Sequence, residues 1–370
     1  MLKVLYDHQC FSYQEYGGVS RYFVELIKHL NSLYFAETDL SIKYSNNQYL
    51  NEIDRQDIKK FLPRLKFKGK TSLLSAINKN LSKLKLAQQN YDVFHPTYYD
   101  PYFLDNLSGK SFVLTVHDMI HELFPNAVSR WDKTSQHKRI LVKEAKKIIC
   151  VSENTKNDLV RILNADEKKI FVIYHANSLK YNRSKKLETE LNLPKRFLLY
   201  VGSRKYYKNF TFMTDAIADL LKHEKDLYLI CAGGGNFSKK EINFFKELNI
   251  ESKIKQIPVN DDILGMLYTN ALAFIFPSLY EGFGIPVLES FYCGCPVICS
   301  NSSSLPEIAE NAAEYFEPTN KSSIYSAVGK ILNDKQRREE LKTLGAERLK
   351  YFNWETSALQ TYEVYKNSLK

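Results

Sequence analysis

Short apolar runs rich in β-branched and aromatic residues alternate with longer helical patterns along the whole chain. Such alternation predicts parallel strands joined by covering helices, and its appearance in both halves predicts two Rossmann-like α/β domains. A chain of 370 residues is also long enough for two separate hydrophobic cores. The expected strands are 3–6, 40–44, 93–95, 112–116, 147–151, 170–174, 197–201, 227–232, 254–259, 271–276, 296–299 and 314–316.

A polar segment without a core pattern, from Asn177 to Leu193, predicts the boundary between the two domains. We therefore expect one domain over residues 1–178 and a second over residues 179–351. Ligands of open α/β sheets bind beyond the carboxyl ends of the strands, so two facing domains would share one cleft.

The composition is that of an ordinary globular protein, with 44% hydrophobic and 25% charged residues. No run of 18 or more apolar residues occurs, which argues against a membrane-spanning helix. The first residues enter a strand pattern at once, which indicates that no signal peptide is present. Cys293, Cys295 and Cys299 bound a short apolar strand and lack the paired spacing of a zinc site. We therefore expect a cytoplasmic protein with reduced cysteines and no metal.

Positive charge is concentrated in residues 55–85, where ten basic residues accompany one acid, Asp57, and leucines and isoleucines are interleaved. A basic amphipathic stretch of this kind predicts contact with an anionic membrane surface, here the inner face of the cytoplasmic membrane. A solvated basic face on a helix that packs against its own domain is the alternative. Nucleic-acid binding is not expected, because no aromatic stacking signature accompanies the charge.

The stretch from Phe276 to Glu289 combines a strand, a glycine turn and a helix. The apolar run 271–276 is typical of a buried strand. Gly282 and Gly284 allow the backbone to approach a ligand closely, and Pro286 suits the first position of a helix.

This strand–turn–helix geometry predicts a binding site for a phosphate group. Backbone amides at a helix start lack partners within the helix, and the helix dipole adds positive charge, so a phosphate fits there. Glu281 lies on the turn, and Glu289 is expected in the first turn of the helix, where it could accept hydrogen bonds from ribose hydroxyls. The alternative is that Glu281 is only a solvated loop residue and Glu289 only complements the dipole. The intervening glycines and proline favour a phosphorylated, polyhydroxylated ligand.

The sequence Glu-Gly-Phe-Gly-Ile-Pro-Val-Leu-Glu, residues 281–289, resembles the E-x7-E signature of retaining glycosyltransferases of family 4, which have the GT-B fold. Residues 294–300 and 304–308 continue the resemblance. It implies a bacterial surface-polysaccharide enzyme of the mannosyltransferase-like kind, two facing Rossmann-like domains, and a C-terminal helix within 352–370 that crosses back onto the first domain. It also implies that the nucleotide sugar contacts Glu281, Gly282, Phe283, Gly284, Ile285 and Glu289.

Two segments of the first half fit the same resemblance. Gly17 and Gly18 precede a helix with an apolar face and resemble the glycine-rich loop that closes over the donor phosphates, although paired glycines also mark ordinary turns. His117 directly follows an expected strand, where family members have a histidine against the transferred sugar. A structural histidine is the alternative.

Two segments of the second half supply positive charge and a base contact. Arg204 and Lys208 follow a strand and a turn at Gly202, so they could neutralise the charge that grows on a departing diphosphate. In many relatives the arginine and lysine are spaced further apart, and exposed surface charges are the alternative. Val259 ends another expected strand, at a position where a backbone group of family members meets the nucleotide base.

The resemblance therefore predicts a retaining glycosyltransferase that moves a hexose-type sugar from a nucleoside-diphosphate sugar to a lipid-linked or glycan acceptor. The expected setting is assembly of O-antigen, capsule or lipopolysaccharide. His117, Arg204, Lys208 and Glu281 are the candidate catalytic residues, and no metal or other cofactor is expected. A nucleotide-sugar epimerase of the same fold and a catalytically silent scaffold subunit of a glycan-assembly complex are the alternatives.

Overall fold

The computed structural model describes residues 1–53, 55, 57–127, 129–182 and 191–370. The chain forms two compact units. The N-terminal unit contains Met1–Ala176 and Asn353–Lys370, and the C-terminal unit contains Asn177–Phe352. The sequence predicts the first boundary two residues later, after residue 178, and the start of the C-terminal crossover segment at residue 352.

The strands of the N-terminal unit form two three-stranded parallel ladders, β2-β1-β3 and β4-β5-β6. An isolated parallel bridge between Phe94 and Phe112 connects the ladders. The strands are β1 (Leu2–Tyr6), β2 (Ala36–Leu40), β3 (Val93–His95), β4 (Val113–Val116), β5 (Lys147–Cys150) and β6 (Ile170–Val172). In this register Tyr6 lies opposite both Leu40 and His95, so the carboxyl ends of these three strands meet at one edge.

The second strand differs from the prediction, which places it at residues 40–44. β2 covers Ala36–Leu40 and pairs with β1 over its whole length. It is an edge strand whose three central residues, Glu-Thr-Asp, are polar and not buried, so an apolar run could not reveal it. The other predicted strands overlap the observed ones, with ends that differ by at most two residues.

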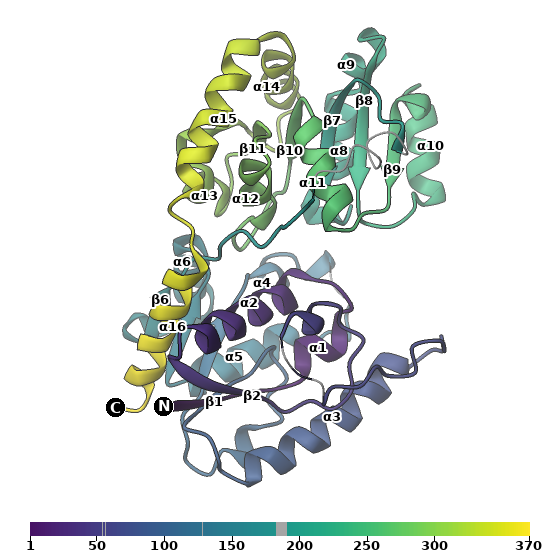
Figure 1. Ribbon diagram of the computed structural model, residues 1–370. Coiled ribbons are helices and arrows are strands. Elements are labelled where there is room, and N and C mark those ends of the chain that lie inside the picture. The colour runs from purple at the N-terminus through teal and green to yellow at the C-terminus, as the bar shows by residue number, and fades with distance from the viewer. Residues whose placement is uncertain (54, 56, 128, 183–190) are drawn as a thin grey trace. The chain divides into compact units, whose positions relative to one another are not determined.

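Helices of the N-terminal unit include the C-terminal helix α16, which contacts α2 (Figure 1). The Ser357 hydroxyl of α16 donates to the Tyr174 carbonyl at 2.7 Å. The Tyr365 hydroxyl lies 2.7 Å from both the Tyr6 hydroxyl and His95 Nδ1, all of them buried. Buried polar contacts therefore fix α16 on this unit. The helices are α1 (Gln9–Tyr13), α2 (Gly18–Ser32), α3 (Lys70–Ala87), α4 (Ile120–Leu123), α5 (Thr134–Glu144), α6 (Glu153–Leu163) and α16 (Trp354–Ser368).

The C-terminal unit has one parallel sheet with the strand order β12-β11-β10-β7-β8-β9. Its strands are β7 (Arg196–Val201), β8 (Leu227–Ala232), β9 (Ile254–Ile257), β10 (Ala273–Phe276), β11 (Val297–Ser300) and β12 (Ala313–Phe316). The chain first builds β7, β8 and β9 outward and then returns to place β10 on the other side of β7. This reversal creates a topological switch point between β7 and β10, where open α/β sheets bind ligands.

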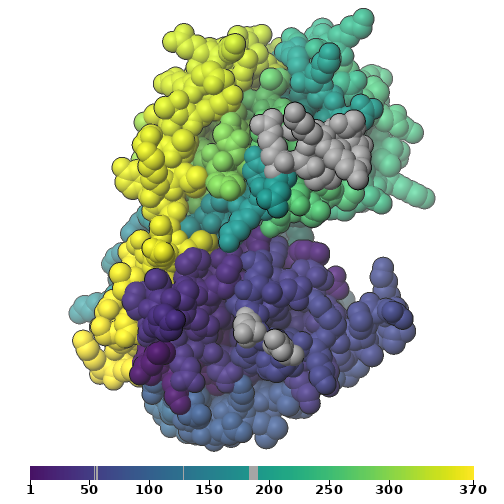
Figure 2. Space-filling model, viewed as in Figure 1, coloured from purple at the N-terminus to yellow at the C-terminus, as the bar shows by residue number. Residues whose placement is uncertain are grey.

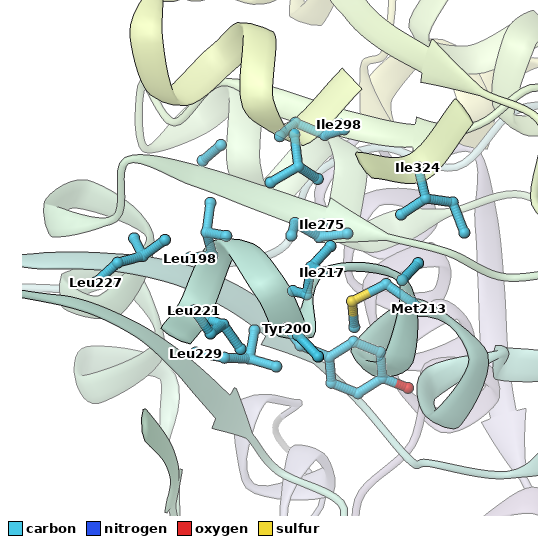
Figure 3. Close-up of a cluster of buried hydrophobic side chains, with 14 of the residues drawn as sticks. Leu198, Tyr200, Met213, Ile217, Leu221, Leu227, Leu229, Ile275, Ile298 and Ile324 are labelled. Atoms are coloured by element: carbon cyan, nitrogen blue, oxygen red, sulfur yellow. The ribbon is translucent and has the colours of Figure 1, made fainter. Parts of the chain in front are cut away.

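Both faces of this sheet are buried, as expected for parallel strands covered by helices. Alternate strand residues such as Leu198 and Ile275 point into one core cluster, where helical side chains meet them (Figure 3). On the opposite face Phe274 packs edge-on against Tyr268 at 5.4 Å between ring centroids. The helices are α8 (Phe210–Ala216), α9 (Ala218–His223), α10 (Lys239–Glu247), α11 (Asp261–Asn270), α12 (Ile285–Tyr292), α13 (Leu305–Ala309), α14 (Lys321–Asn333) and α15 (Lys335–Leu349). Among the described helices, none combines the length and the apolar character needed to span a bilayer.

Candidate active site

The turn after β10 has the strand–turn–helix form that the sequence predicts. α12 begins at Ile285, and its N-cap, Gly284, has φ 104°, in the left-handed region that favours glycine. A Cβ atom at this position would also lie 2.8 Å from Leu305 Cδ2. Pro286 is the second helical residue, where its missing N–H leaves no intrahelical bond unmade. The backbone can therefore enter α12 this tightly only with glycine at position 284.

Glu289 lies deeper in α12 than the sequence suggests. It is the fifth residue of the helix, not part of the first turn, and it is half-buried. Its Oε2 accepts a hydrogen bond from the Tyr268 hydroxyl of α11 at 3.1 Å. Burial, and then the Glu289 carboxylate, raise the pKa of Tyr268 well above its usual value, so this hydroxyl stays protonated and donates. Tyr268 thus orients the carboxylate that the sequence assigns to ribose binding.

Lys208 and Glu281 meet at the switch point of the sheet. Lys208 follows β7, Glu281 follows β10, and these strands are hydrogen-bonded neighbours. Lys208 Nζ lies 2.6 Å from Glu281 Oε1, with the two side chains 18% and 11% exposed. The lysine also lies over the Phe276 ring, 5.5 Å from its centroid. Two of the four candidate catalytic residues therefore form one half-buried ion pair.

Two serines that the sequence did not single out hold the turn around Glu281. The Glu281 amide donates to Ser303 Oγ at 2.9 Å. The fully buried Ser304 hydroxyl lies 3.0 Å from the Glu281 carbonyl oxygen and 2.9 Å from that of Phe283. Both serines follow β11, the strand next to β10, so the serine run at 302–304 is the signal that could have identified them.

Arg204 occupies a different environment from the one predicted. Its Nε donates to Glu241 Oε1 at 2.5 Å, and Nη2 donates to the carbonyls of Gly235 and Asn236, each at 3.0 Å. Only 5% of the side chain is exposed. The guanidinium therefore finds its acceptors within its own unit. The predicted contact of Arg204 with a diphosphate stays a prediction, and it would require the guanidinium to leave these acceptors.

The other residues predicted in the C-terminal unit lie at the same edge of the sheet. Gly202 follows β7 with φ 117°, and its amide donates to the Ala232 carbonyl at 2.9 Å. Val259 follows β9, directly before Asn260, the N-cap of α11. The residues that the sequence assigns to this unit's site therefore follow the carboxyl ends of β7, β9 and β10, strands of one parallel sheet.

In the N-terminal unit the paired glycines begin α2, but a side chain partly covers this helix start. Gly17 is the N-cap, and a Cβ atom there would overlap the Gln14 side chain. Gln14 Oε1 accepts from the Ser20 amide at 3.0 Å. Gln14 therefore takes one of the amides that a phosphate at Gly17 and Gly18 would otherwise use.

His117 directly follows β4, as predicted, and its ring is packed. It lies edge-on to Tyr22 at 5.1 Å and parallel to His175 at 6.0 Å between ring centroids. Its backbone amide donates to the Tyr99 hydroxyl at 3.1 Å. Burial, followed by the charges of His95 and Lys138, lowers the pKa of His117 to about 3. Within the described residues its buried Nε2 has no hydrogen-bond partner. The ring is therefore neutral at physiological pH.

Two protein-family models match this chain. Residues 16–179 match "Glycosyltransferase Family 4", and residues 182–348 match "Glycosyl transferases group 1". The chain belongs to the family 4 glycosyltransferases. Gly17 and His117 fall in the first match, and the turn from Glu281 to Glu289 falls in the second.

A relative agrees with this membership, and solved structures share the fold. O-antigen chain mannosyltransferase B of Escherichia coli is 29% identical over 288 residues, 74% of this chain and 74% of its own. Sucrose-phosphate synthase from Thermosynechococcus elongatus superposes with a TM-score of 0.80 at 20% identity, over 99% of each chain. Anabaena Alr3699/HepE in complex with UDP-glucose gives a TM-score of 0.75 at 16% identity, over 99% of this chain and 100% of its own. The predicted GT-B fold of two Rossmann-like domains is confirmed.

Proposed function

We propose that this glycosyltransferase is a retaining enzyme that moves a hexose-type sugar from a nucleoside-diphosphate sugar to a growing surface glycan of the O-antigen, capsule or lipopolysaccharide type. The observation that carries the proposal is the Lys208–Glu281 pair at the switch point, beside the glycine-capped start of α12. The similarity to an O-antigen mannosyltransferase supports the glycan class, and a structural neighbour bound to UDP-glucose supports the donor class.

Each group in the C-terminal unit has a chemical role in this proposal. The Lys208 ammonium and the amides at the start of α12 neutralise the charge on the departing diphosphate. Glu281 exchanges its lysine partner for a hydroxyl of the transferred sugar, while Glu289, oriented by Tyr268, accepts from the ribose hydroxyls. The neutralising charge comes from these groups, and no metal or other cofactor takes part.

Retention follows from attack on the same face of the sugar that the diphosphate leaves. The bond between the anomeric carbon and the phosphate oxygen breaks, and the acceptor oxygen forms a bond to that carbon. The acceptor proton passes to a leaving phosphate oxygen, which gives a glycoside and a nucleoside diphosphate as products. His117 stays the proposed sugar contact of the N-terminal unit, and as a neutral ring it acts through packing and hydrogen bonding.

A thermal-shift panel of GDP, UDP, dTDP and their sugar conjugates tests the donor class. A ligand at 100 times its Kd stabilises a protein by about 2.7 kcal/mol, which is readily measured. Stabilisation by one nucleotide is expected, and the absence of any response would favour the scaffold alternative. Conversion of the nucleotide sugar without an added acceptor would favour the epimerase. The anomeric configuration of the product, determined by NMR, then tests retention.

The proposal includes a membrane contact on the acceptor side, through the basic segment 55–85, and the exposure of one part of this segment supports it. Residues 62–69 are all exposed and alternate apolar with basic side chains. Leu65 and Phe67 are 55% and 45% exposed, and the segment ahead of α3 projects from the body of its unit (Figures 1 and 2). By contrast, Lys79 and Lys85 of α3 are paired with Asp100 and Asp39. We therefore place the proposed contact with anionic lipid at residues 62–69, at the inner face of the cytoplasmic membrane.

Sedimentation with phosphatidylglycerol vesicles tests this contact, with phosphatidylcholine vesicles for comparison. Binding to the anionic vesicles is expected to fall several-fold when residues 64, 66 and 68 are changed to glutamate. The same charge change at Arg139, Lys143 and Lys146, also exposed on this unit, is the matched control. Equal loss in both sets would show a general charge effect, and no loss in either would contradict the proposed surface.

A further inference from the structure

Three consecutive glycines after β8 adopt a backbone conformation that other residues rarely take. Gly233, Gly234 and Gly235 have φ angles of 74°, 68° and 74°. A Cβ atom on Gly234 would lie 2.6 Å from the Gly202 carbonyl oxygen and 2.7 Å from Arg204 Nη1. The glycine loop, residues 233–236, thus packs directly on the turn after β7 and leaves no room for a side chain at its centre.

The Arg204 guanidinium holds the carbonyl side of the glycine loop. It donates to the carbonyls of Gly235 and Asn236 at 3.0 Å and, more weakly, to that of Gly233 at 3.4 Å. The Phe237 ring lies against the guanidinium, 4.8 Å from centroid to Cζ. A planar fork can reach several acceptors at once, which an ammonium group cannot do with the same geometry.

Glu241 of α10 holds the guanidinium from the other side. Its Oε1 accepts from Arg204 Nε at 2.5 Å, and its Oε2 accepts from the Ser238 amide and hydroxyl, each at 2.7 Å. Burial alone would raise the pKa of Glu241, but the hydrogen bonds from Ser238 and Arg204 outweigh burial and lower it. The carboxylate is therefore charged at neutral pH and anchors Arg204 to a capped helix.

The amide side of the loop is open. Residues 234–236 are exposed, and no acceptor among the described residues takes the amides of Gly234, Gly235 or Asn236. In a left-handed turn, successive amides point to one side and the carbonyls to the other, so binding the carbonyls directs the amides outward. Rows of backbone amides of this kind bind oxygen atoms of anionic ligands. The loop lies at the carboxyl edge of the sheet, next to the turn at Gly202.

We propose that Arg204 and Glu241 are a positioning pair, which holds the glycine loop so that its amides bind oxygen atoms of the nucleoside diphosphate. Arg204 acts through the loop and does not contact the diphosphate. This inference rests on the proposed nucleotide-sugar donor. It replaces the role that the sequence assigns to Arg204 and adds Glu241, which the sequence analysis did not identify.

The variant Glu241→Gln distinguishes a positioning role of Arg204 from direct binding of the diphosphate by Arg204. If the pair positions the loop, Arg204→Met and Glu241→Gln each weaken binding of the nucleotide, and the double variant is no weaker than the worse single variant. If Arg204 instead binds the diphosphate directly, Glu241→Gln releases the guanidinium and leaves binding unchanged or tighter. Arg204→Lys keeps the charge without the fork, so positioning predicts that lysine does not rescue binding.

The experiment measures Kd for UDP and for GDP by calorimetry with the full chain and each variant, followed by donor KM and kcat. We expect Kd and KM to rise about tenfold in both single variants while kcat at saturating donor changes less than threefold. Arg337→Met removes a comparable arginine of the same unit, which pairs with Glu314 at 3.0 Å, and controls for lost stability. Unchanged Kd in Glu241→Gln, or additive losses in the double variant, would overturn the inference.

The same calorimetry distinguishes a failure of the proposed function from a failure of the positioning pair. Wild-type protein that binds no nucleotide in the calorimeter contradicts the donor class itself. Wild-type binding that survives in the variants contradicts only the positioning pair. Should Arg204→Met fail to fold, Glu241→Gln still decides the question, because its amide group preserves the size of the side chain.

Discussion

Replacing Lys208 by methionine separates the structural role of this residue from the catalytic role proposed for it. The ammonium lies 2.6 Å from Glu281 Oε1, and the two side chains are 18% and 11% exposed. Methionine keeps the length of the side chain but leaves the carboxylate without this partner in a poorly solvated place.

The expected loss of stability follows from that burial. Removing one partner of a fully buried ion pair costs about 3–5 kcal/mol, whereas exposed pairs contribute about 0–1 kcal/mol. A pair of intermediate burial should lie between these limits, at roughly 2 kcal/mol, which corresponds to a Tm decrease of about 4–8 °C for a domain of this size. The double variant Lys208→Met, Glu281→Gln has no uncompensated charge and should regain most of this stability.

Turnover should respond differently from stability. If Lys208 neutralises the departing diphosphate as proposed, its loss should lower turnover by ~10²-fold, and the double variant should not recover it. Release of nucleoside diphosphate, measured with the donor that the thermal-shift panel identifies, gives the rate. Lys321→Met removes a more exposed lysine paired with Asp215 at 2.5 Å, and should change neither quantity appreciably. Near-normal turnover in Lys208→Met, or full recovery of turnover in the double variant, would refute this reasoning.

Two further predictions concern the supports of the site. Ser304→Ala removes the hydroxyl that donates hydrogen bonds to two buried carbonyls, so it should destabilise the protein by about 1–3 kcal/mol and raise the KM for the nucleotide sugar. The neighbouring Ser302→Ala should do neither. Urea unfolding measures the stability, and titration with the nucleotide sugar measures the KM. Burial lowers the pKa of His95 to about 3. The contribution of the neutral ring to stability is therefore complete above about pH 6.5. Below that pH only the unfolded chain takes up the proton, so the free energy of unfolding falls by about 1.4 kcal/mol per pH unit. Urea unfolding at pH 7, 6 and 5 should show this decline, with a shallower slope in His95→Gln, and parallel profiles would contradict it.

Local signals in the sequence were sufficient for most of the fold and for part of the site. Apolar runs identified eleven of the twelve strands, and the signal is clearest in strands that are buried along their whole length, such as β10 and β11. The edge strand β2 was placed four residues too late, because its three central residues, Glu-Thr-Asp, are polar and form no apolar run. The turn at Gly284 was likewise predictable, since a left-handed N-cap followed by Pro286 depends on residues adjacent in the chain.

What the sequence could not give is the set of partners that each charged side chain finds. Arg204 and Lys208 are four residues apart and looked alike as candidate diphosphate ligands. The structure turns Arg204 toward Glu241 beyond β8 and Lys208 toward Glu281 beyond β10. The physical reason is strand order: β7 lies between β8 and β10, so the turn that follows it has a different neighbour on each side. The sequence by itself determined which segments form strands, turns and helices, because those depend on periodicity and backbone freedom within a few residues. Only the tertiary structure decided which partners the two cations find: Glu281 for Lys208, and Glu241 with the carbonyls of the glycine loop for Arg204.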